Sequence, residues 1–177
     1  RSTLFPYTTL FRSRTGAQIK GGHAVLIYGA SGSVGTFAIQ VAKYFGAVIT
    51  AVCSTANMEL VRSLGADHVI DYTKEDFKKI PSSFDVIFDA VGKTSRSACK
   101  HLLKPGGRYV SVTGSPKEKP DDLLFLKELI ESGKMKTVID RRYSLAQIRE
   151  AHTYVEQFRK KGNVVVNVVD QTKTQGL

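Results

Sequence analysis

A turn of small residues at positions 30–35 is the part of the sequence best suited to chemistry. It reads Ala-Ser-Gly-Ser-Val-Gly, with Gly29 before it and an apolar run before that. The backbone of such a turn can approach a ligand closely, and the first amides of a following helix point their N–H groups at an anion. The spacing Ala-x-Gly-x-x-Gly therefore predicts a site for the diphosphate of a dinucleotide.

The motif leaves two interpretations open, because it is not the strict Gly-x-Gly-x-x-Gly. Gly32 could be a plain turn residue and Gly35 a helix-packing residue, with no ligand at all. The context favours the dinucleotide. An apolar strand comes before the turn, and after it Val34, Phe37 and Val41 follow the spacing of one helix face.

The elements that must position this turn alternate between strand and helix patterns. Strands are predicted at 24–28, 48–53, 68–72, 85–91, 108–113, 137–143 and 164–169, and helices at 34–45, 56–64, 76–80, 94–103, 121–132 and 144–160. This alternation predicts an α/β fold, a Rossmann-type doubly wound parallel sheet, as a single domain with a C-terminal helix and strand extension.

Ligands of such sheets bind at the carboxyl ends of the strands. We therefore expect one crevice edge to be formed by the turn at 30–35 and by the short segments that follow the second, fourth and fifth strands. These segments are Ser54-Thr55, Val91-Gly92 and Thr113-Gly114. The alternative is that Ser54 and Thr55 only cap a helix and that the others are ordinary strand-to-loop turns.

The composition excludes several classes of protein. The chain has 177 residues, is 42% hydrophobic and 24% charged, and has a net charge of +10. It contains no run of 18 apolar residues, so no membrane partner is expected. Its basic clusters, at 78–79, 141–142 and 159–161, are not interleaved with stacking aromatic residues. We interpret them as solvated surface charge and expect no nucleic-acid partner.

The cysteines and histidines indicate neither disulfides nor a metal site. Cys53 and Cys99 lie far apart in apolar surroundings, without a Cys-x-x-Cys motif. No histidine lies near a cysteine or carboxylate at the spacing of metal ligands. The sequence therefore predicts reduced thiols, a cytoplasmic location and no metal.

Residues 1–13 do not share the pattern of the rest. Thr3 to Ser13 correspond, residue for residue, to the translation of a sequencing-library adapter. We interpret 1–13 as a disordered, adapter-derived artefact, 14–170 as the dinucleotide-binding domain and 171–177 as a tail. A natural basic tail is the alternative. On the adapter interpretation, the chain is the C-terminal part of a longer protein.

Four stretches in this order resemble the medium-chain dehydrogenases/reductases, in the branch of quinone oxidoreductases, zeta-crystallins and zinc-binding alcohol dehydrogenases. They lie at 26–35, 64–72, 85–92 and 138–163, and the resemblance covers about 14–169. It implies an NAD(P)H-dependent oxidoreductase that passes hydride to a quinone or an enone. The residues that it assigns to the cofactor are Ala30, Gly32, Ser33, Val34, Gly35, Ser54, Thr55, Tyr72, Val91, Gly92, Thr113 and Gly114.

The same resemblance favours NADPH over NADH. It places the amides of Ser33 and Val34 at the pyrophosphate, and the hydroxyls after the second strand at the adenosine ribose. An NAD enzyme usually has an acid there, which would repel a 2′-phosphate. Tyr72 matches a tyrosine near that phosphate. Many relatives carry an arginine where this chain has Ala56, so this chain lacks one of the features that accompany the NADPH preference in those relatives.

In this family the substrate pocket and any zinc ligands come mainly from an N-terminal domain that is missing here. We therefore name no catalytic residue, expect a small-molecule substrate only in the full-length protein, and expect the chain to be inactive alone. Relatives are usually homodimers, but the short segment 115–120 replaces a longer apolar one and puts the dimer edge in doubt.

Two other functions stay open. Residues 103–107 resemble a signature of S-adenosylmethionine-dependent methyltransferases. The chain could also be a non-catalytic, crystallin-like module that binds NADPH.

Overall fold

The computed structural model describes residues 17–81, 83–113 and 120–168. The predicted artefact, the predicted tail and Gly114 lie outside these residues, as does the short segment up to 119. The elements are β1 Ala24–Tyr28, α2 Ser33–Tyr44, β2 Val48–Cys53, η2 Thr55–Asn57, α3 Met58–Ser63, β3 His68–Asp71, η3 Phe77–Lys79, β4 Phe84–Asp89, η4 Lys100–Leu102, β5 Leu103–Ser111, α4 Pro120–Glu131, β6 Ile139–Ser144, η5 Leu145–Gln147, α5 Ile148–Glu156 and β7 Asn163–Asn167.

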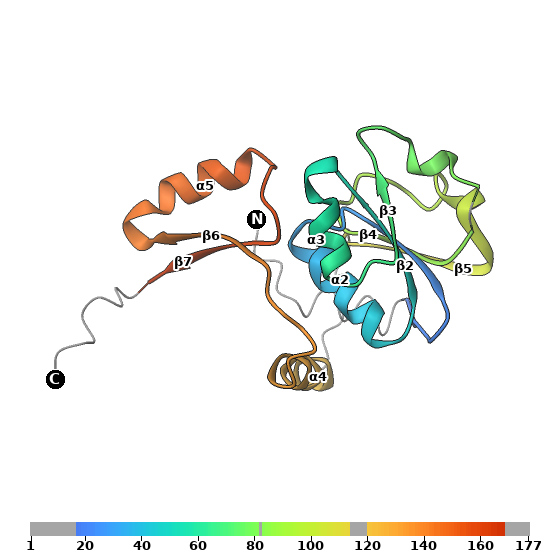
Figure 1. The fold of residues 1–177 in the computed structure, drawn as a ribbon, viewed down its shortest axis with the longest axis horizontal. Helices are drawn as coiled ribbons and strands as arrows, with labels where there is room; N and C mark the ends of the chain where they lie inside the picture. The colour runs from blue at the N-terminus through green and yellow to red at the C-terminus, as the bar shows by residue number, and fades with distance from the viewer. Residues whose placement is uncertain (1–16, 82, 114–119, 169–177) are drawn as a thin grey trace.

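The main sheet has five parallel strands in the order β3-β2-β1-β4-β5 (Figure 1). The chain therefore runs outward from β1 to β3 and then returns to the other side of β1 for β4 and β5. The strand order reverses beside β1, which is where ligands of doubly wound sheets bind. The predicted Rossmann-type fold is confirmed.

The central strands are continuous apolar runs because both faces of the sheet are covered. Val25 and Ile27 pack on one face, together with α2 and Val61 of α3. Leu26 packs on the opposite face with Phe77 of η3 and with the segment around Leu102. Alternate residues of β1 thus enter two separate hydrophobic clusters, and the end of the strand is held rigidly.

Helix α2 is buried from Val34 to Ala42, not only on the face toward the sheet. Its outer side is covered by α4 and the residues that follow, through contacts of Val41 with Leu129 and Met135. Gln40 adds two hydrogen bonds to the backbone of Lys136, donating to its carbonyl oxygen at 3.0 Å and accepting from its amide at 2.7 Å. The helix that carries the small-residue turn is therefore fixed from both sides.

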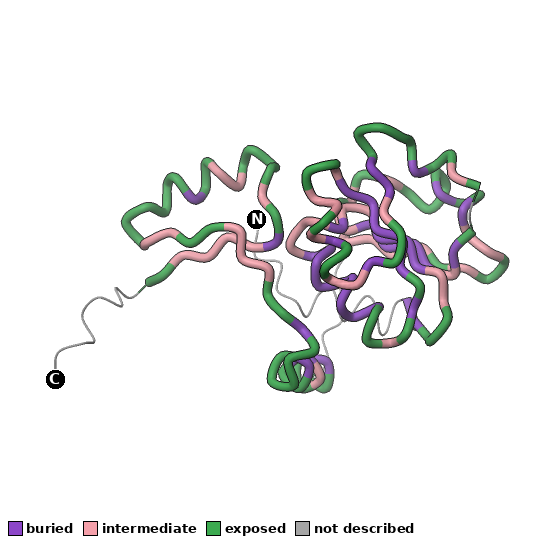
Figure 2. Tube along the Cα trace, in the orientation of Figure 1, coloured by how far each residue is buried: buried purple, intermediate pink, exposed green. Residues whose placement is uncertain are grey.

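Strands β6 and β7 pair in parallel as a separate two-stranded sheet, with α5 between them in the chain. This unit lies beside the main sheet (Figure 1) and buries far less of its surface, as Figure 2 shows. It corresponds to the predicted C-terminal extension. A short segment of it, around Gly162, contacts the small-residue turn.

The helix predicted at 94–103 is wrong. The segment forms turns and the short η4, and β5 begins at Leu103 instead of at 108. Ser95 accepts a hydrogen bond from the amide of Ala98 through its own hydroxyl, at 3.2 Å. Asp89 binds the amide of Thr94 at 3.0 Å. Side-chain bonds to nearby amides compete with the helical hydrogen bonds, which is why serine-rich segments favour turns.

Three other predicted helices are shorter than expected. The one at 76–80 is the 3₁₀ turn η3, capped by the Asp76 carboxylate, and the one at 56–64 divides into η2 and α3. The last helix begins with the predicted capping box, now η5, but α5 ends at Glu156 instead of reaching Lys160. Phe158 then takes a left-handed conformation, with φ 56°, and turns the chain back toward α2.

Candidate functional site

The small-residue turn connects the end of β1 to α2 at the carboxyl edge of the sheet. Gly29 has φ 78°, a conformation that favours glycine, and both its amide and that of Ala30 donate to the carbonyl oxygen of Val52. Gly32 is the N-cap of α2, and no side chain caps this helix end. The N-terminus of a helix is the positive end of its dipole, which favours a bound anion.

The two glycines of the turn have different roles. A Cβ on Gly35 would come within 2.2 Å of the Gly29 carbonyl oxygen, so Gly35 allows α2 to pack against the end of β1. A Cβ on Gly32 would make only an ordinary 3.5 Å contact. Packing therefore requires a glycine at position 35, whereas it does not require one at position 32.

The side chains of the turn face two directions. Ala30 and Val34 are buried in the core, so only their backbone can meet a ligand. The Ser33 hydroxyl instead donates to the Gly162 carbonyl oxygen at 2.7 Å. That contact with the C-terminal segment was not foreseen from the sequence.

The predicted segments after β4 and β5 do lie next to the turn. A Cβ on Gly29 would come within 2.3 Å of Cγ2 of Val91, and a Cβ on Gly92 within 3.0 Å of Cγ2 of Thr113. These contacts form a continuous row along the carboxyl edge of the sheet. Thr113 is the last residue of this row that the structure describes, since Gly114 lies outside it.

Asp89 holds this row in place, and sequence reasoning missed it. Its fully buried carboxylate accepts hydrogen bonds from the amides of Val91, Gly92 and Thr94, at 2.8 to 3.0 Å. It also accepts from the Tyr109 hydroxyl at 3.0 Å. Burial, and then this hydrogen bond to Asp89, raise the pKa of Tyr109. The Tyr109 hydroxyl thus keeps its proton and donates it to Asp89. A side chain of β5 therefore stabilises the loop that follows β4.

Asn57 connects the turn to the end of β2 and was likewise missed. Its side-chain nitrogen donates to the hydroxyl of Ser31 at 3.0 Å and to that of Ser54 at 3.1 Å. Because both hydroxyl oxygens accept, their protons remain able to donate to oxygens of a ligand. Ser54 does not cap η2, which has no side-chain cap; Asn57 instead connects its hydroxyl to that of Ser31.

Thr55 has a different environment from the one predicted. Its hydroxyl donates to the carboxylate of Asp71, at the end of β3, so that proton is not directed at a ligand. Asp71 also accepts from the hydroxyl and the amide of Thr73, at 2.6 and 3.0 Å. The hydrogen bond from Thr55, followed by that from Thr73, lowers the pKa of Asp71. The sequence analysis considered an acid only directly after the second strand, whereas the acid beside Thr55 comes from the end of β3.

Tyr72 lies near the end of β2, where its amide donates to the Cys53 carbonyl oxygen at 3.0 Å. Its side chain is 54% exposed and lines a cavity of about 440 Å³. Lys74 lines the same cavity, and its ammonium lies 3.8 Å from the Asp71 carboxylate. A phosphate bound beside Tyr72 would therefore meet a cation that the sequence analysis did not consider.

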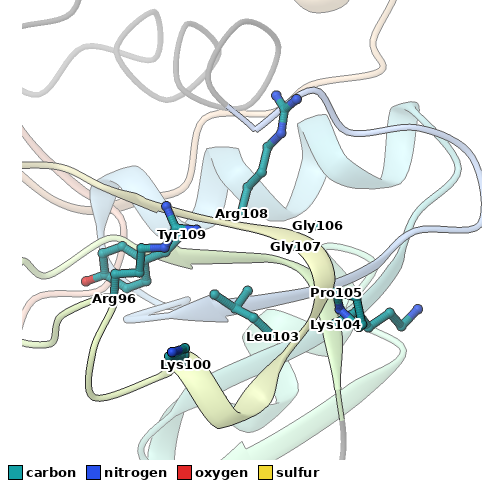
Figure 3. A pocket seen from close by; sticks show the side chains of 9 residues that line it. All are labelled: Arg96, Lys100, Leu103, Lys104, Pro105, Gly106, Gly107, Arg108 and Tyr109. Atoms are coloured by element: carbon teal, nitrogen blue, oxygen red, sulfur yellow. The ribbon is translucent and has the colours of Figure 1, made fainter.

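A larger cavity of about 680 Å³ lies along the first part of β5, away from the row of strand ends (Figure 3). Four cationic residues line it, but Figure 3 shows Arg108 and Lys104 extending in different directions. Lys104 is paired with Asp85 at 2.8 Å. The cations do not converge on one point, so we assign this cavity no ligand.

Within residues 17–81, 83–113 and 120–168, no group of three histidine, cysteine, aspartate or glutamate side chains could hold a metal ion. No helix of that part of the chain is long and apolar enough to cross a membrane.

A family model described as "Zinc-binding dehydrogenase" matches residues 33–157. The chain belongs to this family. The zinc in its description does not fit the described residues of this chain, so no step below depends on a metal. The methyltransferase interpretation finds no support in this match, which is to a family of dehydrogenases.

Among the relatives of this chain is the 2-methylene-furan-3-one reductase of Solanum lycopersicum, 38% identical over 91% of this chain and 44% of its own length. The chloroplastic NADPH-dependent alkenal/one oxidoreductase of Arabidopsis thaliana is 36% identical over 84% of this chain and 42% of its own. The apo structure of the 2-octenoyl-CoA carboxylase reductase CinF from a Streptomyces species superposes with a TM-score of 0.77, at 30% identity, over 97% of this chain and 46% of that one.

Proposed function

We propose that this chain binds a nicotinamide dinucleotide, NADPH in preference to NADH, for an oxidoreductase that transfers hydride to or from a small quinone, enone or alcohol. The observation that carries the proposal is the uncapped start of α2 at the carboxyl edge of the sheet, beside the ends of β2, β4 and β5. The names of the two relatives, a furanone reductase and an alkenal/one oxidoreductase, support an enone as the substrate class.

Each part of the site suits one part of such a cofactor. The first amides of α2, at 33–35, would hold the diphosphate. The hydroxyls of Ser31 and Ser54, oriented by Asn57, would donate to phosphate or ribose oxygens. The row formed by Val91, Gly92 and Thr113 would line the nicotinamide end. The bound nicotinamide would supply or accept the hydride, and the residues of this chain would orient it.

The preference for NADPH depends on charge at the end of β2. A 2′-phosphate beside Ser54 and Tyr72 is repelled by Asp71 and attracted by Lys74. The Asp71 carboxylate already accepts three hydrogen bonds, one from Thr55 and two from Thr73. Lys74 is exposed, so its ammonium can extend toward a ligand. We expect attraction to dominate, in agreement with the named cofactor of the Arabidopsis relative.

The chain spans between 42% and 44% of the length of the two curated relatives. The substrate, the dimer and the activity are therefore proposals for the whole protein. A cytoplasmic location also stays a prediction, since the Arabidopsis relative is named as chloroplastic.

Calorimetric titration of the 177-residue chain with NADPH, NADH and S-adenosylmethionine tests the proposal. We expect one site that binds NADPH more tightly than NADH and does not bind S-adenosylmethionine. Tighter binding of S-adenosylmethionine than of either dinucleotide would refute it. Tighter binding of NADH than of NADPH would overturn only the argument about the 2′-phosphate.

A further inference from the structure

The segment after α5 returns to the small-residue turn and is fixed against it. The Gly162 amide donates to the Ser31 carbonyl oxygen at 2.8 Å, and Gly162 forms a parallel bridge with Gly32. The Ser33 hydroxyl donates to the Gly162 carbonyl oxygen. Three consecutive residues of the turn thus contact a glycine that lies about 130 positions later in the chain.

This contact places the ammonium of Lys160 at the first residue of α2. Its Nζ donates to the Ser33 hydroxyl and, at 2.9 Å, to the Gly162 carbonyl oxygen. These bonds use two of the three donors of an ammonium. Lys160 and Ser33 also line a cavity of about 150 Å³, so the ammonium borders open space.

The charge of Lys160 is not balanced by the protein around it. Among the described residues, no carboxylate lies within 4.0 Å of its Nζ; that of Asp140 instead accepts from Tyr154 and from the amide of Lys161. His152 also lines the cavity. Burial lowers the pKa of Lys160, and the more distant Asp140 offsets this only in part. A cation next to the positive end of a helix is unfavourable unless an anion joins them.

We propose that Lys160 is a direct ligand of the diphosphate group and, together with the first amides of α2, holds it from the C-terminal side. This inference rests on the proposed dinucleotide function and adds to it a specific cation from a distant part of the chain. The anion would bind the free donor of Lys160 and the helix end at once, and its charge would balance both. Binding would therefore also tie the segment at 160–162 more firmly to the turn.

Replacement of single lysines tests this assignment. In Lys160→Met the side chain keeps its length and loses its charge, and Lys160→Arg keeps the charge. The matched control is Lys161→Met, because Lys161 is exposed and uses only its amide in the contact with Asp140. Each variant is titrated with NADPH and with adenosine 2′-monophosphate, which carries the 2′-phosphate but no phosphate at the 5′ position. Circular dichroism confirms the fold of each variant.

Loss of a hydrogen bond to a charged group should weaken NADPH binding by about 10- to 100-fold in Lys160→Met. Binding of adenosine 2′-monophosphate should change by less than about threefold, and Lys161→Met should bind NADPH within about twofold of the wild type. Lys160→Arg should recover most of the loss. Equal NADPH binding by Lys160→Met and wild type would overturn the inference alone, whereas a wild-type chain that binds no dinucleotide would overturn the proposed function with it.

A measurement on the unaltered chain covers the case in which Lys160→Met does not fold. The side-chain resonance of Lys160 is followed by NMR against pH, without ligand and with saturating NADPH. A phosphate in contact should raise the pKa of Lys160 on binding. An unchanged or lower pKa with NADPH bound would refute the contact.

Discussion

Gly35 lies so close to Gly29 that a Cβ placed on Gly35 would be 2.2 Å from the Gly29 carbonyl oxygen. This is backbone that cannot move aside without displacing the end of β1. We therefore expect Gly35→Ala to lower the free energy of unfolding by about 2–3 kcal/mol, the cost of overpacking a rigid site. Chemical denaturation measures this change directly.

Gly32→Ala is the matched control for that prediction. Gly32 has φ −78°, which any residue adopts, and its added Cβ would meet only an ordinary contact. We expect the stability of Gly32→Ala to stay within about 1 kcal/mol of the wild type. The new methyl group would stand before the first amides of α2 and weaken NADPH binding by about tenfold or more, or about 1.4 kcal/mol. If Gly35→Ala and Gly32→Ala had equal effects on stability and on binding, the assignment of Gly35 to packing and of Gly32 to ligand binding would be contradicted.

Asn57 should matter for the cofactor more than for the fold. Asn57→Leu removes the donor that orients the hydroxyls of Ser31 and Ser54, so NADPH binding should weaken by about 3- to 10-fold, with a loss of about 1 kcal/mol in stability. Calorimetry and denaturation measure the two effects. Ser63→Ala, which removes an exposed hydroxyl on α3, serves as a control and should leave binding unchanged. Unaltered binding by Asn57→Leu would show that these hydroxyls do not contact the ligand.

Lys74 should determine part of the preference for the 2′-phosphate. Lys74→Ala is expected to weaken NADPH binding by about 3- to 10-fold and to leave NADH binding unchanged, because only NADPH carries that phosphate. Lys127→Ala, which removes an exposed cation from α4, controls for the loss of net charge. If Lys74→Ala weakened binding of both cofactors equally, the lysine would not read the 2′-phosphate.

Cys53 gives a prediction about pH. Burial, assisted by the charge of Asp71, raises the pKa of its thiol to about 11 from 9.0. Between these values the unfolded chain releases a proton that the folded chain retains. The protonated thiol of Cys53 therefore contributes fully to the free energy of unfolding below pH 9. This contribution is lost as the pH rises, by up to about 1.4 kcal/mol per pH unit.

Cys53→Ala isolates this effect from that of other groups. Denaturation at several pH values should show a steeper loss of stability for the wild type than for Cys53→Ala between pH 9 and 11. The same burial predicts that neither Cys53 nor Cys99 reacts with a thiol reagent until the chain unfolds. Parallel pH profiles for the two chains would show that folding does not raise the pKa of the Cys53 thiol. Rapid labelling of the native wild type would show an accessible thiolate.

The sequence predicted the main sheet well because its strands carry a local signal. The bounds of β1 and β2 agree with the structure residue for residue, since continuous apolar runs between turn residues can be recognised from the sequence alone. The segment at 94–103 was wrong for a different reason. Ser95 accepts a hydrogen bond from the amide of Ala98, and Asp89 accepts one from that of Thr94, and these bonds compete with an otherwise plausible helix.

The candidate site was predicted only as far as its local motif. The turn and the strand ends follow from spacing and topology. Asn57, Asp71 and Lys160 carry no such signal, because their partners come from other elements of the fold. Lys160 in particular belongs to a basic cluster that was interpreted as solvated surface charge. Only the turn at Phe158 directs it to α2.

The central claim is that the start of α2 binds a dinucleotide. Amide chemical shifts of the ¹⁵N-labelled chain, recorded with and without NADPH, test it most directly. We expect the largest changes at 31–35 and at 160–162, with smaller changes at Ser54, Val91 and Thr113. Changes confined to the cavity along 96–109, or no changes at saturating NADPH, would contradict it.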